Sequence, residues 1–373
     1  MAGKRYLAPW RRAAAATRMV VPGDDGREVL AALEGKPALY HCVSRAVWRE
    51  MVFGETEKER FVRALRKWEA FSQVRVLTFC MMTNHFHLLV EVPERPEKDP
   101  SDGELLEHLG LIYGAEKLAG IRWELEQYRS QGNRAAAEAL RERYLRRMWD
   151  LSVFMREWKQ GFSRWFNGRH ERRGYLWEER FKSVLVEEGH AARVVACYID
   201  LNPVRAGMVG EAGEYRWSGW GEAVAGNRKA REGLRQVMLE RELGRSNPSR
   251  AVRQVEDWHE VLAEYRGLMA ADEGERRGRH GAGTAGVPGE ARGRGGARGG
   301  RLSEAEMLRR RVRYFVDGLV VGSEGFVEGV FALTRDRFAA GRVSGARRIA
   351  RMQTPLRSMR ALQDACAKTR IGA

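Results

Sequence analysis

The sequence contains no apolar run of about 18 residues, the length that a membrane-spanning helix requires, and this excludes such a helix. Cysteine is also scarce. The four residues, Cys42, Cys80, Cys197 and Cys366, are too far apart for a CxxC metal knuckle or a small disulfide scaffold. Reduced cytosolic thiols are the simpler interpretation. Residues 1–21 lack the apolar segment of a secretory signal, so we expect a cytoplasmic protein without a membrane partner.

The charge balance favours a polyanionic partner. The chain has 66 Lys and Arg residues against 50 Asp and Glu residues, a net charge of +16. Such an excess is typical of nucleic-acid-binding proteins, although charge alone does not distinguish nucleic acid from acidic lipid. Hydrophobic residues make up 43% of the 373 residues, which is enough for a sizeable core.

The pattern up to residue 92 predicts a strand, a helix and a pair of strands. Residues 37–45 have a β-rich composition and predict the first strand. Residues 55–71 follow as an amphipathic helix. Residues 76–92 are apolar and β-branched enough for two strands, joined by a tight turn near Thr83 and Asn84.

Helices dominate the following part of the chain. Residues 104–167 are charged and helix-favouring, and their length indicates two or more helices. Residues 175–186 indicate a loop that enters another strand. Residues 190–201 predict a helix that ends at Asn202, because a residue followed by proline avoids the helical region and Pro203 comes next.

Changes in composition predict four parts along the chain. The Gly- and Arg-rich stretch at 274–301 cannot bury enough apolar surface to fold and indicates a flexible basic linker. The parts are a basic N-terminal arm at 1–36, a main domain at 37–225 with a helical insertion at about 102–149, a partly helical segment and linker at 226–301, and a basic helical C-terminal extension at 302–373.

A histidine pair in the segment MTNHFHLLV is the first candidate for chemistry. Alternate residues of a strand share a face, so His85 and His87 point one way and Phe86 points the other. Two imidazoles on one face are able to bind a single divalent metal ion. The competing interpretation is that both are polar positions on a half-exposed strand. His41, in the first strand, has two interpretations: a position near the metal ion or, more simply, a structural histidine.

The second candidate is the segment CYIDLNPVRAGMV. On a helix, Tyr198 and Asn202 are four residues apart and face the same side. The tyrosine hydroxyl is a poor nucleophile near neutral pH and needs a neighbouring metal ion or base. Asn202 is a candidate third metal ligand through its amide oxygen. Without the histidines, Tyr198 would be interpreted as a core aromatic residue.

Basic residues mixed with aromatic rings precede the second segment. Such mixtures bind single-stranded nucleic acid, because bases stack on the rings while cations contact the phosphates. The alternative is that Trp165 and Trp177 belong to the core and the arginines are solvated. The candidate DNA-binding residues are Arg164, Arg169, Arg172, Arg173, Arg180, Lys182 and Arg205.

Four separated motifs resemble, in their order, those of the REP-associated tyrosine transposases. The motifs are ALYHCVSR, MTNHFHLLV, GYLWEERFKSVLVE and YIDLNPVRAGMV, and they extend over residues 37–220. This family belongs to the HUH superfamily of single-strand nucleases, which is named for its histidine-hydrophobic-histidine motif.

The resemblance implies an α+β fold with a ferredoxin-like antiparallel sheet and packed helices, the HUH nuclease core. It implies Mg²⁺ or Mn²⁺ as cofactor, held by His85, His87 and Asn202. Tyr198 would attack a DNA phosphate and form a 5′-phosphotyrosine intermediate. The partner would be single-stranded or hairpin DNA formed by repeated extragenic palindromes. A monomer and a homodimer are both open.

Three other functions compete with transposase-type nicking and strand transfer. The first is a non-catalytic, sequence- or structure-specific DNA-binding protein derived from a transposase. The others are an initiator of rolling-circle replication and a metal-dependent hydrolase unrelated to DNA. The complete set of His85, His87, Tyr198 and Asn202 favours the enzyme, and the charge of +16 disfavours the hydrolase.

Overall fold

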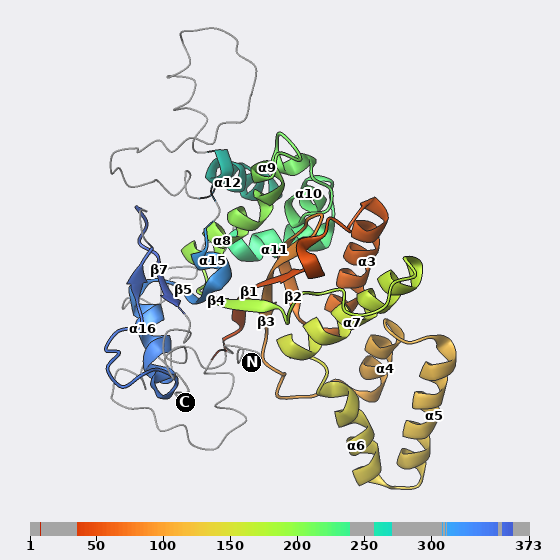
Figure 1. The fold of residues 1–373 in the computed structure, drawn as a ribbon. Helices are drawn as coiled ribbons and strands as arrows, with labels where there is room; N and C mark the ends of the chain where they lie inside the picture. Colours follow the sequence, from red (N-terminus) through yellow and green to blue (C-terminus); the bar gives the residue numbers. More distant parts are fainter. Residues whose placement is uncertain are drawn as a thin grey trace, which may run out of the picture.

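A seven-stranded sheet forms the centre of the protein, with strand order β2-β3-β1-β4-β5-β7-β6 (Figure 1). The computed structural model describes residues 36–238, 257–270, 312–349 and 353–360, together with Ala8, Leu308 and Arg310. The predicted linker at 274–301 and, apart from Ala8 and Lys36, the predicted N-terminal arm lie outside these residues. The strands are β1 (Ala38–Arg45), β2 (Arg75–Met81), β3 (His85–Val92), β4 (Lys182–Val186), β5 (Gly318–Gly322), β6 (Arg347–Arg348) and β7 (Arg357–Arg360).

The first four strands have the ferredoxin-like topology. Helix α3 (Glu55–Ser72) follows β1, the β2–β3 hairpin comes next, and a group of helices ending with α7 (Leu151–Arg169) leads to β4. All neighbouring pairs among these four strands are antiparallel. A β-α-β-β-α-β order with this pairing is the ferredoxin-like arrangement, so the predicted α+β fold is confirmed.

The two faces of this sheet bury different sets of side chains. Successive residues of a strand point to opposite faces, so Phe86 and Leu88 of β3 pack on the side of α3 and α7. The opposite face is covered by α8 (His190–Asp200) and α11 (Arg228–Met238), and α12 (Trp258–Ala270) packs on these two helices. His85 and His87 alternate with Phe86 and Leu88 and therefore lie on the α8 side.

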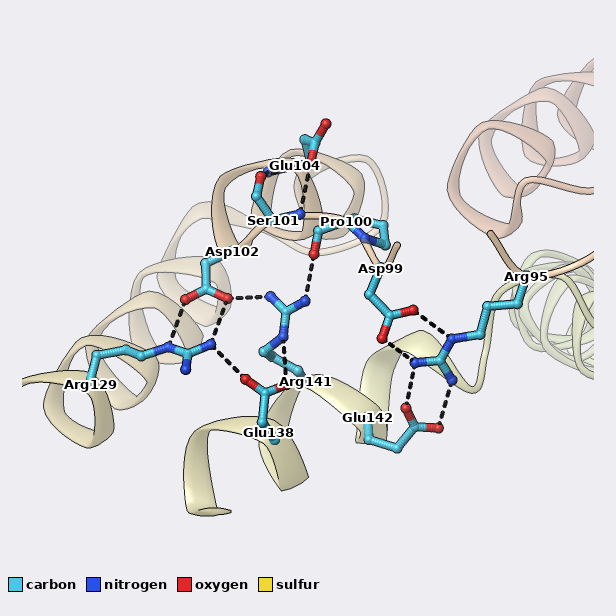
Figure 2. A network of polar contacts seen from close by, with 10 residues as sticks. All are labelled: Arg95, Asp99, Pro100, Ser101, Asp102, Glu104, Arg129, Glu138, Arg141 and Glu142. Carbon is cyan, nitrogen blue, oxygen red and sulfur yellow. Dashed lines mark hydrogen bonds and ion pairs between the residues drawn. The ribbon is translucent and has the colours of Figure 1, made fainter. Parts of the chain in front are cut away.

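The helical insertion forms a unit with a hydrophobic cluster of its own. It contains α4 (Asp102–Gly110), α5 (Ala115–Ser130) and α6 (Arg134–Leu145), which project away from the sheet (Figure 1). Figure 2 shows arginines whose bonds connect the start of α4 and the residues before it with α5 and α6. Arg141, whose side chain is nearly buried, donates to the carboxylate of Asp102, to that of Glu138 and to the Pro100 carbonyl.

The C-terminal extension adds strands to the sheet, which its helical residue spacing did not predict. β5 pairs in parallel with β4, and β7 and β6 continue from it. Within the segment GLVVG, Val320 and Val321 are fully buried, as expected of a strand buried on both faces. The remaining helices are α9 (Asn202–Arg205), α10 (Gly219–Val224), α15 (Tyr314–Asp317), α16 (Glu324–Leu333) and the 3-10 turns η1 (Val47–Arg49), η2 (Ala212–Glu214) and η3 (Arg335–Arg337).

No helix in the described part of the chain combines the length and apolarity needed to cross a bilayer.

A buried carboxylate fixes α8 against its neighbours. Asp200, at the end of α8, is fully buried. It accepts hydrogen bonds from the hydroxyls of Thr78 (2.9 Å) and Tyr265 (2.6 Å) and from the backbone N–H of Trp220 (3.3 Å). Burial raises the pKa of the Asp200 carboxyl to about 7. These donors come from β2, α12 and α10, so one side chain ties four elements together.

We predict that Tyr265→Phe lowers the free energy of unfolding by about 1–3 kcal/mol, because the Asp200 carboxylate loses its shortest hydrogen bond in the interior. Chemical denaturation followed by circular dichroism measures this change. The control is Tyr175→Phe, at a side chain that is 90% exposed, where we expect a change within about 0.5 kcal/mol. Equal stabilities of the Tyr265→Phe variant and the wild type would contradict the proposed role of this network.

Candidate active site

The histidine pair lies at the start of β3, on the face covered by α8. His87 is buried, with 3% of its surface exposed, whereas His85 is half-buried at the first position of the strand. Their ring centroids are 5.1 Å apart and the ring planes are nearly perpendicular. The alternation expected from the sequence therefore brings the two imidazoles together.

Tyr198 lies on the face of α8 that is directed at the sheet. Its side chain is buried, with 2% exposed. The centre of its ring is 6.0 Å from that of His87 and 6.2 Å from that of His41, both edge-on. The ring therefore packs against two imidazoles, and the proposed nucleophile lies beside one member of the histidine pair.

Asn202 begins α9, immediately after the end of α8. Its Nδ2 donates to the backbone carbonyls of Tyr198 (3.3 Å) and Ile199 (3.1 Å). An amide that donates through its nitrogen leaves its oxygen as an acceptor. The side chain is therefore oriented by the last turn of α8, with Oδ1 as the atom that would bind a metal ion.

His41 contacts His87 of the pair, although the sequence favours a purely structural histidine at this position. It is fully buried, its Nδ1 is 2.7 Å from the Phe315 carbonyl oxygen, and its Nε2 is 2.9 Å from Nδ1 of His87. Burial lowers the pKa of His41 to about 4, and burial followed by the neighbouring His85 lowers the pKa of His87. The available signal was strand alternation, which places His41 on the same face of β1 as Leu39 and Val43.

Arg205 is half-buried and contacts Tyr198. Its Nη2 donates to the Tyr198 carbonyl (2.6 Å) and its Nη1 to the Leu308 carbonyl (2.5 Å). The guanidinium carbon is 4.2 Å from the centre of the Tyr198 ring, within the range of a cation–π contact. Burial lowers the pKa of this guanidinium. Arg205 was predicted as a DNA contact, and the structure places its donors on protein carbonyls.

A polar cleft of about 270 Å³ opens beside the histidine pair. It includes Arg45, which is paired with His85 across β1 and β3. The predicted DNA-binding residues Arg180 and Lys182 also line it. Arg49 and Arg313 lie there too, although the sequence analysis did not single them out. Five basic side chains thus face three acidic ones, Glu178, Glu179 and Asp317.

The other predicted DNA-binding residues lie apart from the cleft, near the end of α7. Arg164 is exposed on this helix and Arg173 is exposed in the following loop. The remaining two form ion pairs, Arg169 with Glu57 (3.5 Å) and Arg172 with Glu50 (3.4 Å). Trp165 and Trp177 are partly buried against the core, as the structural interpretation of these rings predicted.

The donor atoms around α8 and β3 fit a divalent metal ion in their chemistry. Among the described residues, no group of three or more His, Cys, Asp or Glu side chains is arranged to hold a metal ion. Two imidazoles and an amide oxygen are a different set: carbonyl oxygen suits ions such as Mg²⁺ and Mn²⁺, and imidazole is a common metal ligand. The structure brings the two imidazoles together, and Asn202 lies at the end of α8, where its amide nitrogen bonds the helix carbonyls. His85, His87 and Asn202 would be the ligands.

Residues 36–101 match the family model described as "Transposase IS200 like". The match spans β1, α3, β2 and β3 and includes His41, His85 and His87, but it ends before α8. It supports the resemblance to the REP-associated tyrosine transposases.

One solved structure, "Structure of the REP associates tyrosine transposase bound to a REP hairpin", is similar to 57% of this chain over 94% of its own length. It has 16% sequence identity and a TM-score of 0.33, which is too low to support an argument. No curated protein matches the sequence.

We predict that Arg205→Ala lowers the free energy of unfolding by about 2–4 kcal/mol, because the carbonyls of Tyr198 and Leu308 lose their donor in the interior. Denaturant titration measures the change. The exposed residue Arg164 provides the control, and Arg164→Ala should shift stability by no more than about 0.5 kcal/mol. If the Arg205→Ala variant has the same free energy of unfolding as the Arg164→Ala control and mainly shows a weaker salt dependence of DNA binding, Arg205 contacts phosphate.

Proposed function

We propose that the protein is a metal-dependent endonuclease and strand transferase of transposase type that acts on single-stranded DNA. The observation that carries this proposal is the position of Tyr198, whose ring packs edge-on against His87 of the histidine pair. A tyrosine beside candidate metal ligands is one arrangement that permits phosphodiester transfer through a covalent intermediate.

In the proposed reaction, the Tyr198 oxygen attacks the scissile phosphorus and loses its proton. The bond from phosphorus to the 3′ oxygen breaks, and that oxygen takes up a proton to become a free 3′-hydroxyl. The 5′ end stays on the tyrosine as a phosphodiester. The energy of the cleaved DNA phosphodiester is kept in this linkage, so no nucleotide cofactor is needed as an energy source. Attack of a 3′-hydroxyl on this linkage reverses the step and joins two strands.

Arg205 and the candidate metal ligands support the tyrosine in this reaction. The positive charge of Arg205, 4.2 Å from the ring centre, stabilises negative charge that develops on the Tyr198 oxygen. Its bond to the Tyr198 carbonyl also holds the end of α8 in place. When bound by His85, His87 and Asn202, a divalent metal ion supplies polarisation of the scissile phosphate.

The DNA strand would reach the histidine pair through the basic cleft. Arg49 and Arg180 line it and form no ion pair with any described residue, so both guanidinium groups are available for phosphate. Lys182 is paired with Asp317 at 3.0 Å, and a phosphate would compete with that carboxylate. Cations at this position would align the backbone with the proposed nucleophile.

We predict that Tyr198→Phe abolishes the cleavage of single-stranded hairpin DNA in Mn²⁺, because the nucleophilic oxygen is removed while the ring that packs against His87 is kept. DNA affinity in the presence of chelator should be unchanged. The readouts are a gel assay of end-labelled DNA and fluorescence anisotropy. The control, Tyr128→Phe in α5 of the insertion, should cut at the wild-type rate.

Undiminished cutting by Tyr198→Phe would remove this tyrosine from the mechanism. DNA binding without cutting by the wild type, in Mg²⁺ and in Mn²⁺, would identify the protein as a non-catalytic DNA-binding protein.

A further inference from the structure

Two large aromatic side chains project into solvent beside the cleft. Trp48 is 81% exposed and Tyr175 is 90% exposed. Aromatic residues in monomeric proteins are normally more buried than this. Such exposure leaves the apolar surface of each ring in contact with water. A ligand that covers the rings would remove this surface from water, which is favourable in free energy.

The backbone brings these two residues to the same place. Ala46 forms an antiparallel bridge with Trp177, and the N–H of Val47 donates to the Leu176 carbonyl at 2.9 Å. Trp48 follows Val47 and Tyr175 precedes Leu176, so the two residues are the next ones along the paired segments. They therefore lie at one end of the sheet, where Arg49 lines the cleft.

The segment that carries Trp48 is held in a strained conformation. Trp48 has φ of 58° and Arg49 has φ of 57°, in the left-handed region, which costs a non-glycine residue about 1–3 kcal/mol. The Asn84 side chain maintains it by donating from Nδ2 to the Arg49 carbonyl at 2.9 Å. Asn84 precedes His85, so the position of Trp48 is coupled to the histidine pair.

We propose that Trp48 and Tyr175 form a stacking surface for the bases of a DNA single strand whose phosphates contact Arg49 and Arg180 in the cleft. Bases of unpaired strands stack on aromatic rings, whereas the bases of a duplex are stacked on one another and leave no face free for a protein ring. The inference deepens the proposed function by identifying how the site selects single-stranded substrate, although binding itself requires no catalysis.

The test is fluorescence anisotropy of a labelled oligothymidylate in the presence of chelator. Trp48→Ala and Tyr175→Ala should each weaken binding by about 5- to 150-fold, the equivalent of about 1–3 kcal/mol for one stacked base. Trp48→Phe should retain most of the affinity. The matched control is Trp123→Ala, which removes a ring that is 64% exposed on α5 and should leave the affinity unchanged.

An oligonucleotide with abasic sites separates stacking from charge. It should bind the wild type and Trp48→Ala with the same affinity. The inference is overturned if Trp48→Ala weakens the abasic strand or a blunt duplex as much as the intact strand, or if it changes nothing. This test measures binding and not cutting. A protein that binds in this way without nicking DNA would therefore contradict the proposed catalysis but still support the stacking surface.

Discussion

The antiparallel pairing of β1 with β3 is the constraint on which the site depends. In its register His87 lies opposite Val43 and Leu89 opposite His41, so His41 and His87 are diagonal neighbours on one face. Such neighbours are within reach of aromatic side chains. A slip by one residue would turn the histidines of one strand to the α3 side. The apolar residues that alternate with them, such as Phe86 and Leu88, bury that side and thereby fix the position of the imidazoles.

The site is completed by a segment remote in the sequence. Phe315 of α15 holds His41 through its carbonyl, and its ring contacts Tyr198 with centroids 5.2 Å apart. Arg205 also connects Tyr198 to this remote segment, because it donates to the carbonyls of both Tyr198 and Leu308. Since β5 continues the sheet beyond β4, the C-terminal extension packs as part of the fold and supplies one side of the site.

Local patterns in the sequence were sufficient to predict much of this structure. Strand alternation and helical periodicity predicted β1, α3, the β2–β3 hairpin and α8 close to their observed bounds, because each pattern reports burial within one element. The partners of His41, the bonds of Arg205 to protein carbonyls and the strands of the C-terminal extension were not predicted. They depend on contacts between distant segments, such as the 274 residues that separate His41 from Phe315, and no local pattern carries that information.

In the proposed function, one face of the sheet and α8 together form a site for tyrosine-mediated DNA transfer. This is tested by incubating the full-length protein with labelled single-stranded hairpin DNA from the repeats flanking its gene, with Mn²⁺ or with chelator. We predict a covalent adduct that requires the metal ion and maps by peptide mass to Tyr198. Tight binding without an adduct in any metal ion, or an adduct on a different residue, would contradict it.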